Sequence, residues 1–148
     1  MIINFYSKVK ARLPFGREFA VKIIKKAARE LKIKNNSEIS VLIVGDKEIR
    51  TLNKKYRRKD KITDVLAFSQ KEGSKLFWPR AEADYLGDIL ICFPQLKRQA
   101  KKHGQSPRAE FSLLLLHGFL HLLGYEDKTP AGCLKMDRLQ AKILAKNL

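Results

Sequence analysis

Residues 117–127 read HGFLHLLGYED, and this stretch carries the strongest structural and chemical signal in the chain. The residues around the two histidines are apolar, which predicts a buried helix. His117 and His121 are four residues apart, so a helix places both imidazoles on one face, about one turn apart. That spacing lets two imidazoles bind one small metal ion. Gly124 then ends the helix, and a carboxylate follows it closely, which predicts a metal site on the helix and its C-terminal turn.

Histidines on an apolar helix face also have a simpler explanation, as core residues that each bond a polar partner. Two of them in so apolar a segment would each need such a partner, or desolvation would be costly. The glycine turn and the carboxylate after it favour the metal site. The spacing alone leaves Asp127 and Glu126 open as the third ligand, and His103 is a more distant alternative.

Length and composition predict one globular domain, residues 1–148, that is large enough to bury a core. The apolar run at 113–123 is too short to span a bilayer and contains both histidines. The N-terminal residues lack the charged region and cleavage site of a signal peptide. With only Cys92 and Cys133, no disulfide framework is indicated, so we expect a cytoplasmic protein.

The net charge of +16 predicts a polyanionic partner. Segment 47–61 holds eight Lys or Arg against two acidic residues, and segment 97–108 holds five against none. A lysine-rich, well-solvated surface is the alternative explanation. No segment combines a basic face with a clean apolar face and aromatic anchors, so a membrane is not expected as a partner. Charge therefore favours nucleic acid.

Hydrophobic periodicity and turn residues divide the chain into nine elements. The predicted strands are 2–6, 39–44, 65–69 and 86–93, and the predicted helices are 17–32, 46–57, 94–104, 107–123 and one from residue 130 onward. Asp46 and Ser106 are the predicted N-caps of two helices, and segment 70–84 is a predicted loop. This order predicts an α+β fold: a single small mixed sheet of about four strands packed with about five helices, with a central buried helix carrying the metal ligands.

Four segments together resemble the bacterial YbeY family, single-strand-specific, metal-dependent endoribonucleases of ribosomal RNA maturation. The family motif HGxLHLxGYDH appears here as HGFLHLLGYED. The segments LNKKYR at 52–57, TDVLAF at 63–68 and LGDI at 86–89 are similar to the family's LNxxYR, TDVLSF and LGDI. The matches run in the family's order from 52 to 127, and the chain has a typical length.

The resemblance implies one divalent metal ion held by His117, His121 and Asp127, because Asp127 stands where the family has its third ligand. The family residue there is histidine. Two imidazoles and a carboxylate make a competent zinc site, but they also suit other transition metals. Zinc is therefore the expected ion, and the carboxylate leaves another transition metal open.

The expected reaction is hydrolysis of a phosphodiester bond by a metal-activated water. Gly118 replaces the glutamate that serves as general base in HExxH peptidases, which disfavours a peptidase. Arg57 is the predicted catalytic residue, because the resemblance places this arginine at the metal cavity and its fork suits phosphate. Asp88 interrupts an apolar strand and is expected either to orient a ligand histidine or to cap a turn.

The expected partner is single-stranded ribosomal RNA, with ribosomal subunits as a further partner. Six basic residues are predicted to contact RNA: Lys54, Lys55, Arg58, Lys97, Arg98 and Lys101. The competing function is an RNA- or ribosome-binding assembly factor with a structural metal. A fourth protein ligand would close the site and favour that alternative, but the sequence offers no convincing one.

Overall fold

The computed structural model describes residues 1–70 and 84–145. Over these residues the chain forms a four-stranded mixed sheet and five helices, which confirms the predicted α+β class. In chain order the elements are β1 (Ile2–Ser7), α1 (Arg17–Glu30), β2 (Glu38–Val44), α2 (Asp46–Arg57), β3 (Val65–Ser69), β4 (Tyr85–Cys92), α3 (Phe93–Lys102), α4 (Pro107–Leu122) and α5 (Pro130–Leu144). None of the described helices combines the length and the apolar character needed to cross a membrane.

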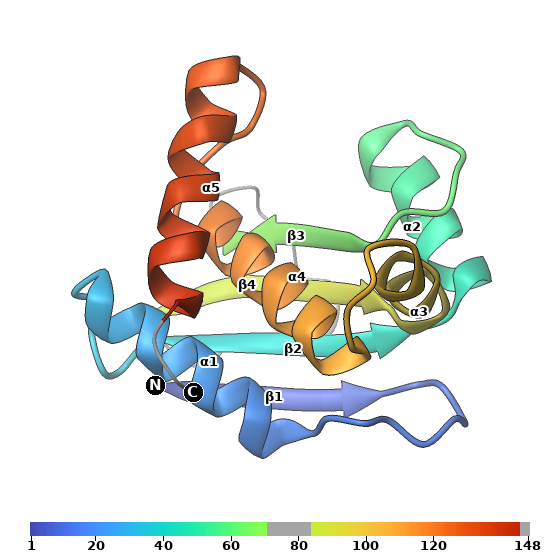
Figure 1. The fold of residues 1–148 in the computed structure, drawn as a ribbon, viewed down its shortest axis with the longest axis horizontal. Coiled ribbons are helices and arrows are strands. Elements are labelled where there is room, and N and C mark those ends of the chain that lie inside the picture. The colour runs from blue at the N-terminus through green and yellow to red at the C-terminus, as the bar shows by residue number, and fades with distance from the viewer. Residues whose placement is uncertain (71–83, 146–148) are drawn as a thin grey trace.

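The strand order in the sheet is β1-β2-β4-β3. β1 pairs with β2 and β2 pairs with β4 in parallel, whereas β3 pairs with β4 antiparallel. β3 therefore lies at one edge of the described sheet, beside β4 and far from β1 (Figure 1). A parallel pair needs a crossover connection, and α1 supplies it between β1 and β2.

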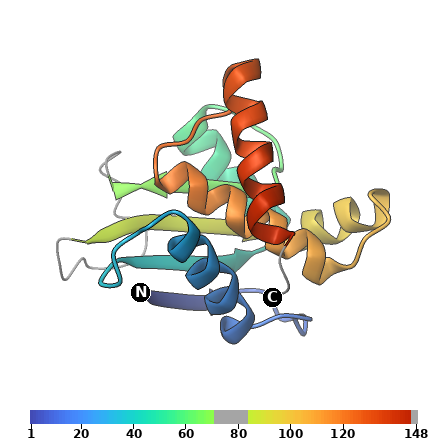
Figure 2. The ribbon, with the colours of Figure 1, turned by 60° about the vertical axis from the view of Figure 1, so that its left-hand side comes forward.

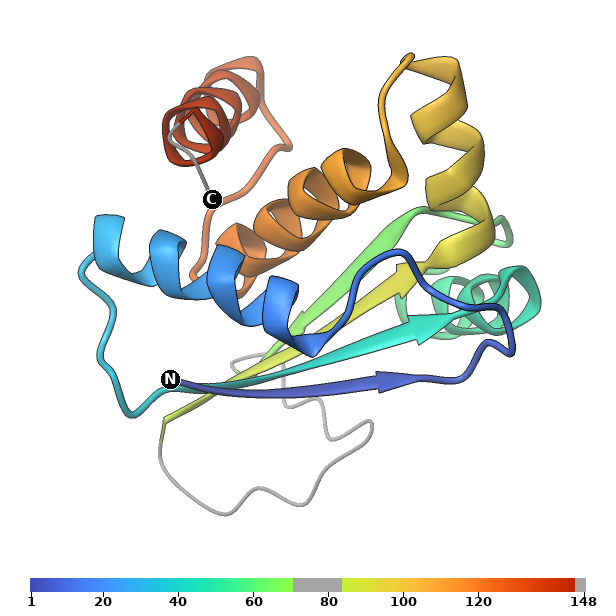
Figure 3. The ribbon, with the colours of Figure 1, turned by 60° about the horizontal axis from the view of Figure 1, so that its bottom comes forward.

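Strand alternation sends apolar side chains to both faces of the sheet. Ile39 and Ile89 belong to the larger core, which α1, α4 and α5 cover on one face (Figure 3). Leu42 and Leu90, which are partners across the β2–β4 pair, belong to a second core with Ile49 of α2. α2 therefore covers the opposite face, and it lies behind the sheet in Figure 2.

α4 is the buried helix that the sequence predicts. Phe111, Leu115 and Phe119 are fully buried on it. Gly118 meets the sheet so closely that an added Cβ would lie 2.8 Å from Cγ2 of Ile89. The absence of a side chain at this position is therefore a packing requirement, and it lets α4 approach β3 and β4.

The helices begin and end within two residues of their predicted bounds, and one of the two predicted N-caps is confirmed. Ser106 caps α4 as expected, because its side chain accepts a hydrogen bond from the Ala109 N–H. The expected Asp46 cap is wrong: Gly45 is the N-cap of α2, without a side-chain hydrogen bond, and Asp46 is the first helical residue. The Asp46 carboxylate instead pairs with Arg98 at 2.7 Å, which draws it away from the helix end. The predicted loop 70–84 lies, apart from its two end residues, outside the described part of the chain.

Candidate metal centre

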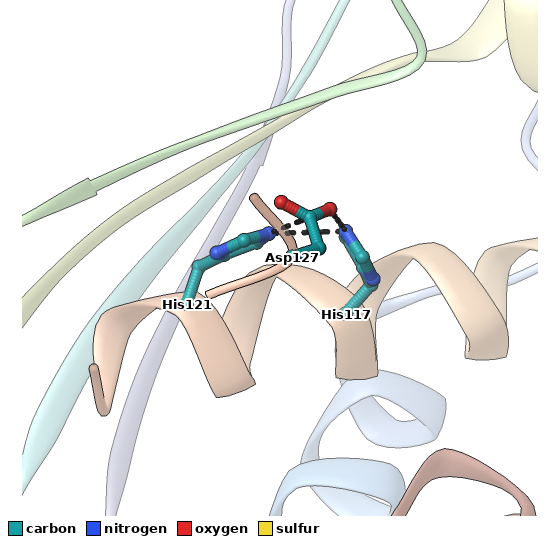
Figure 4. Close-up of side chains that lie close together, drawn as sticks. All are labelled: His117, His121 and Asp127. Carbon is teal, nitrogen blue, oxygen red and sulfur yellow. Dashed lines mark hydrogen bonds and ion pairs between the residues drawn. The ribbon is translucent and has the colours of Figure 1, made fainter. Parts of the chain in front are cut away.

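Three side chains from the end of α4 and the turn after it converge on one point. The Nε2 atoms of His117 and His121 are 3.1 Å apart. Oδ2 of Asp127 lies 3.4 Å from Nε2 of His117 and 3.6 Å from Nε2 of His121. Figure 4 shows both rings rising from the same side of α4 with the carboxylate beside their tips, and β3 running past the group.

This triangle of donor atoms has the size of one face of a tetrahedral metal site. A tetrahedral ion with bonds of about 2.0–2.1 Å separates its ligand atoms by about 3.3–3.4 Å. The observed edges of 3.1, 3.4 and 3.6 Å bracket that value. Two imidazole nitrogens and a carboxylate oxygen are also the donor types that zinc and related divalent ions bind. The three residues thus fit a divalent metal ion in both spacing and chemistry.

The structure selects Asp127 over Glu126 as the third member of the group. Gly124 ends the helix with φ of 100°, a left-handed conformation that favours glycine. Its N–H and that of Tyr125 bond back to the carbonyls of His121 and Leu120. This turn reverses the chain and carries Asp127 back over the rings.

His103, the third histidine, lies elsewhere. Its Nδ1 is 3.3 Å from Oε1 of Glu110, near the start of α4. The metal group found among the described residues accordingly contains only two histidines.

The surroundings of the His121 ring favour its neutral form. Desolvation by burial lowers the pKa of His121 below its ordinary value, and charge on His117 acts in the same direction, whereas Asp127 opposes both. A hydrogen bond with the Tyr125 backbone also acts to raise the pKa of His121, as Asp127 does. A lowered pKa favours the neutral imidazole, which is the form that binds a metal. Nδ1 of His117 is 2.8 Å from Oε1 of Gln140 on α5, a contact that sequence spacing did not reveal.

α5 also holds the turn that carries Asp127. Thr129 caps the helix by accepting a hydrogen bond from the Gly132 N–H. The Cys133 thiol donates to the backbone carbonyl of Asp127 at 2.9 Å. A Cβ on Gly132 would lie 2.4 Å from the carbonyl oxygen of Glu126, so the turn packs against α5 too closely for any side chain at this position.

Arg57, the predicted catalytic residue, reaches the edge of the sheet that borders α4. Its Nη2 donates to the carbonyl of Ala67 in β3 at 2.7 Å. Its guanidinium lies over the ring of Phe68, 4.6 Å from the centroid. Val65 of the same strand packs near Gly118, next to His117 in sequence. The arginine is therefore anchored at the edge strand that α4 contacts. Its guanidinium stacks on a ring of the second core, so it lies toward the face of the sheet that α2 covers, whereas the histidines are on the α4 face.

Asp88 has different neighbours from those expected of a residue that orients a ligand histidine. Ile89 faces α4, so strand alternation turns Asp88 to the opposite face of the sheet. There the buried carboxylate accepts a hydrogen bond from Tyr85, whose hydroxyl also lies 2.7 Å from Oγ of Ser40. Desolvation raises the pKa of Tyr85 far above its ordinary value, so the hydroxyl stays protonated and donates a hydrogen bond to Asp88.

The six predicted RNA-contacting residues are all exposed. Lys54 and Lys55 lie in the last turn of α2 and Arg58 is its C-cap, while the other three lie on α3. The ion pair between Arg98 and Asp46 joins α3 to the start of α2, so the two helices are neighbours (Figure 1), while Lys54, Lys55 and Arg58 lie at the other end of α2. Arg98 is thus partly committed to an internal partner.

Comparisons with known proteins show which family this chain resembles. The family model described as Endoribonuclease YbeY matches residues 2–147. An Endoribonuclease YbeY of Spiroplasma citri is 39% identical over 142 residues, covering 95% of this chain and 86% of that protein. Its counterpart in Staphylococcus carnosus is 43% identical over 122 residues, covering 80% and 77%. The solution structure of the TM1509 protein of Thermotoga maritima matches with a TM-score of 0.60 and 25% identity, covering 97% of this chain and 90% of that one.

The match to the family model extends over nearly the whole chain, including the histidine helix and the turn with Asp127. The curated relatives exceed the identity at which a shared family is secure, and they match over most of their own length. This protein therefore belongs to the YbeY endoribonuclease family.

Proposed function

We propose that this protein is a metal-dependent, single-strand-specific endoribonuclease that acts in ribosomal RNA maturation. The observation that carries the proposal is the triangle of donor atoms from His117, His121 and Asp127, in a chain of the YbeY endoribonuclease family. Zinc is the ion that this donor set favours, and the carboxylate also admits other transition metals.

The site is open, which favours catalysis over a structural metal. The side chains of His117, His121 and Asp127 are 27%, 28% and 43% exposed, so solvent and substrate reach them. The metal group among the described residues has three members, whereas structural zinc sites have four protein ligands. When bound, a divalent ion would lower the pKa of a coordinated water to near neutrality and so supply a nucleophile.

The chain itself must meet the charge that develops on the phosphate. Gly118, next to the first histidine, faces Ile89 and has no side chain that could act as acid or base. Arg57 is the group we assign to this role. Its contacts with Ala67 and Phe68 hold the planar fork in place before substrate arrives, and preorganised charge is what stabilises a transition state.

The substrate assignment rests on charge. Six exposed basic residues lie on two neighbouring helices, and the chain carries a net charge of +16. Neutralising successive phosphates with such a surface supplies binding that does not depend on base sequence. The proposed selectivity for single strands and for ribosomal RNA rests on the resemblance to the family, not on the charge.

The test pairs metal analysis with RNA cleavage. Purified wild-type protein should contain about one divalent ion per chain. It should cleave a single-stranded ribosomal RNA fragment and leave the same sequence intact as a duplex. His121→Ala should lose both the ion and the cleavage while it still binds RNA. Wild-type protein that binds metal and RNA but leaves the single strand intact would support the assembly-factor alternative instead.

Arg57→Ala tests the role given to the arginine. Removal of one preorganised charge donor should lower the single-turnover cleavage rate by roughly 10²–10³ while metal content stays unchanged. Lys59→Ala is the matched control, since Lys59 is an exposed cation two positions further along the chain. Equal cleavage rates for Arg57→Ala and wild type at saturating protein would show that Arg57 only attracts RNA.

A further inference from the structure

One buried amide contacts the metal group from a helix that contributes none of its three ligands. Gln140 lies on α5 with 6% of its surface exposed. Its Oε1 is 2.8 Å from Nδ1 of His117. The other nitrogen of the same ring, Nε2, faces His121 and Asp127. The His117 ring is thus held at both ends, by α5 on one side and by the metal group on the other.

The contact decides which nitrogen of His117 carries the proton. A neutral imidazole has one N–H and one lone pair, on different nitrogens. Nε2 needs its lone pair to bind an ion, so the proton must be on Nδ1, and Nδ1 must then donate. The carbonyl oxygen of Gln140 accepts the hydrogen bond from this Nδ1–H group. If the amide presented its NH2 group instead, the proton would move to Nε2 and His117 could not serve as a ligand.

We propose that Gln140 is a positioning residue of the metal centre, which fixes the tautomer and the ring orientation of His117. The inference rests on the proposed metal site. A hydrogen bond from the far nitrogen of a ligand histidine is a common way to orient the ring and strengthen the ligand. Gln140 makes the contact to a ligand histidine that was one of the two roles expected of Asp88, and it does so from the α4 face of the sheet, where the histidines are.

The packing of α5 makes the contact rigid. Met136 and Ile143, one turn before and three residues after Gln140, are both 1% exposed and belong to the main core. Cys133 of the same helix donates to the backbone of Asp127. One face of α5 therefore anchors the helix in the core and also contacts two of the three ligand residues.

Gln140→Leu tests the proposal, because leucine keeps most of the volume and removes the acceptor. Zinc affinity, measured by competition with a chromophoric chelator, should fall roughly 10–100-fold. Gln140→Glu restores an acceptor and should bind zinc at least as tightly as the wild type. Lys142→Ala is the control for substitution on α5, since Lys142 is an exposed side chain of the same helix, and its zinc affinity should match the wild type.

A second readout needs no metal. Nitrogen-15 NMR of the metal-free wild type should show His117 as the Nδ1–H tautomer, and Gln140→Leu should show a shift toward Nε2–H. Unchanged zinc affinity together with an unchanged tautomer in Gln140→Leu would overturn the proposal. If the wild type binds no zinc at all, the metal site itself fails, and an Nε2–H tautomer in that protein would overturn the role of Gln140 as well.

Discussion

Replacing Gly132 by alanine should damage the metal centre without touching a ligand. A Cβ at this position would lie 2.4 Å from the carbonyl oxygen of Glu126 and 3.1 Å from Oγ1 of Thr129, whereas ordinary contacts begin at 3.4 Å. Relief of the closer overlap requires a shift of about 1 Å in the backbone just before Asp127. Metal sites tolerate changes in ligand distance of only about 0.2 Å. The carboxylate should therefore leave its place beside the two rings.

The expected loss of zinc affinity is roughly 10–100-fold, the range seen when the support of a ligand is removed. The effect on folding should be smaller. Alanine gains about 1 kcal/mol over glycine inside a helix, and the overlap costs about 1–3 kcal/mol, so the free energy of unfolding should fall by at most about 2 kcal/mol. Chelator competition measures the first quantity and urea denaturation of the metal-free protein measures the second.

Gly16→Ala is the matched control, because a Cβ at Gly16 meets nothing within 4 Å. Its zinc affinity should equal that of the wild type. If Gly132→Ala also binds zinc with wild-type affinity, the contact between α5 and the turn does not position Asp127, and the reasoning about this helix is refuted.

A plot of log binding constant against log salt concentration for single-stranded RNA should have a slope steeper than about −2, since each neutralised phosphate contributes about −0.7. A shallower slope would show that the basic surface does not serve mainly to bind RNA. Iodoacetamide at neutral pH should modify Cys133 but spare Cys92, because burial raises the pKa of the Cys92 thiol to about 12. Mass spectrometry measures the modification of each cysteine, and alkylation of Cys92 in the folded protein would contradict this expectation. Asp46→Asn should lower the free energy of unfolding at pH 7 by at most about 1 kcal/mol. The Arg98 guanidinium holds the pKa of the Asp46 carboxyl below its usual range, so this contribution is present above the unfolded value of about 3.9 and disappears as pH falls through the folded pKa. A difference between variant and wild type that persists in strong acid would contradict that cause.

Short-range patterns in the sequence were sufficient for the elements and for two of the three ligand candidates. The four-residue spacing of His117 and His121 works through helix geometry alone, and a helix formed there in the structure. Ser106 before a proline marked the start of α4, and Gly124 marked its end. These predictions held because each depends on residues within one or two turns of one another.

The tertiary structure decided everything that depends on which face or which partner a residue meets. In the sequence Asp46 stands between a predicted strand and a predicted helix, as a capping residue would, but in the structure it is the first helical residue and Arg98, 52 residues away in sequence, pairs with its carboxylate. Asp88 interrupts an apolar strand, but the pairing of β4 turned it away from the histidines toward Tyr85. A period-two pattern shows that neighbours face opposite sides, and it does not say which side will carry the site.

The same limit explains why Gln140 was missed and why Asp127 could not be separated from Glu126 by spacing alone. Gln140 is 23 residues from His117 in sequence, and only the packing of α5 on α4 brings its amide to the ring. The left-handed turn at Gly124 and the close contact at Gly132 set the path of the chain that presents Asp127. The local sequence determined that a helix with two histidines and a carboxylate turn would form, because those features depend on backbone geometry. Long-range packing determined how the donors meet, because their distances depend on elements that are adjacent only in the folded chain.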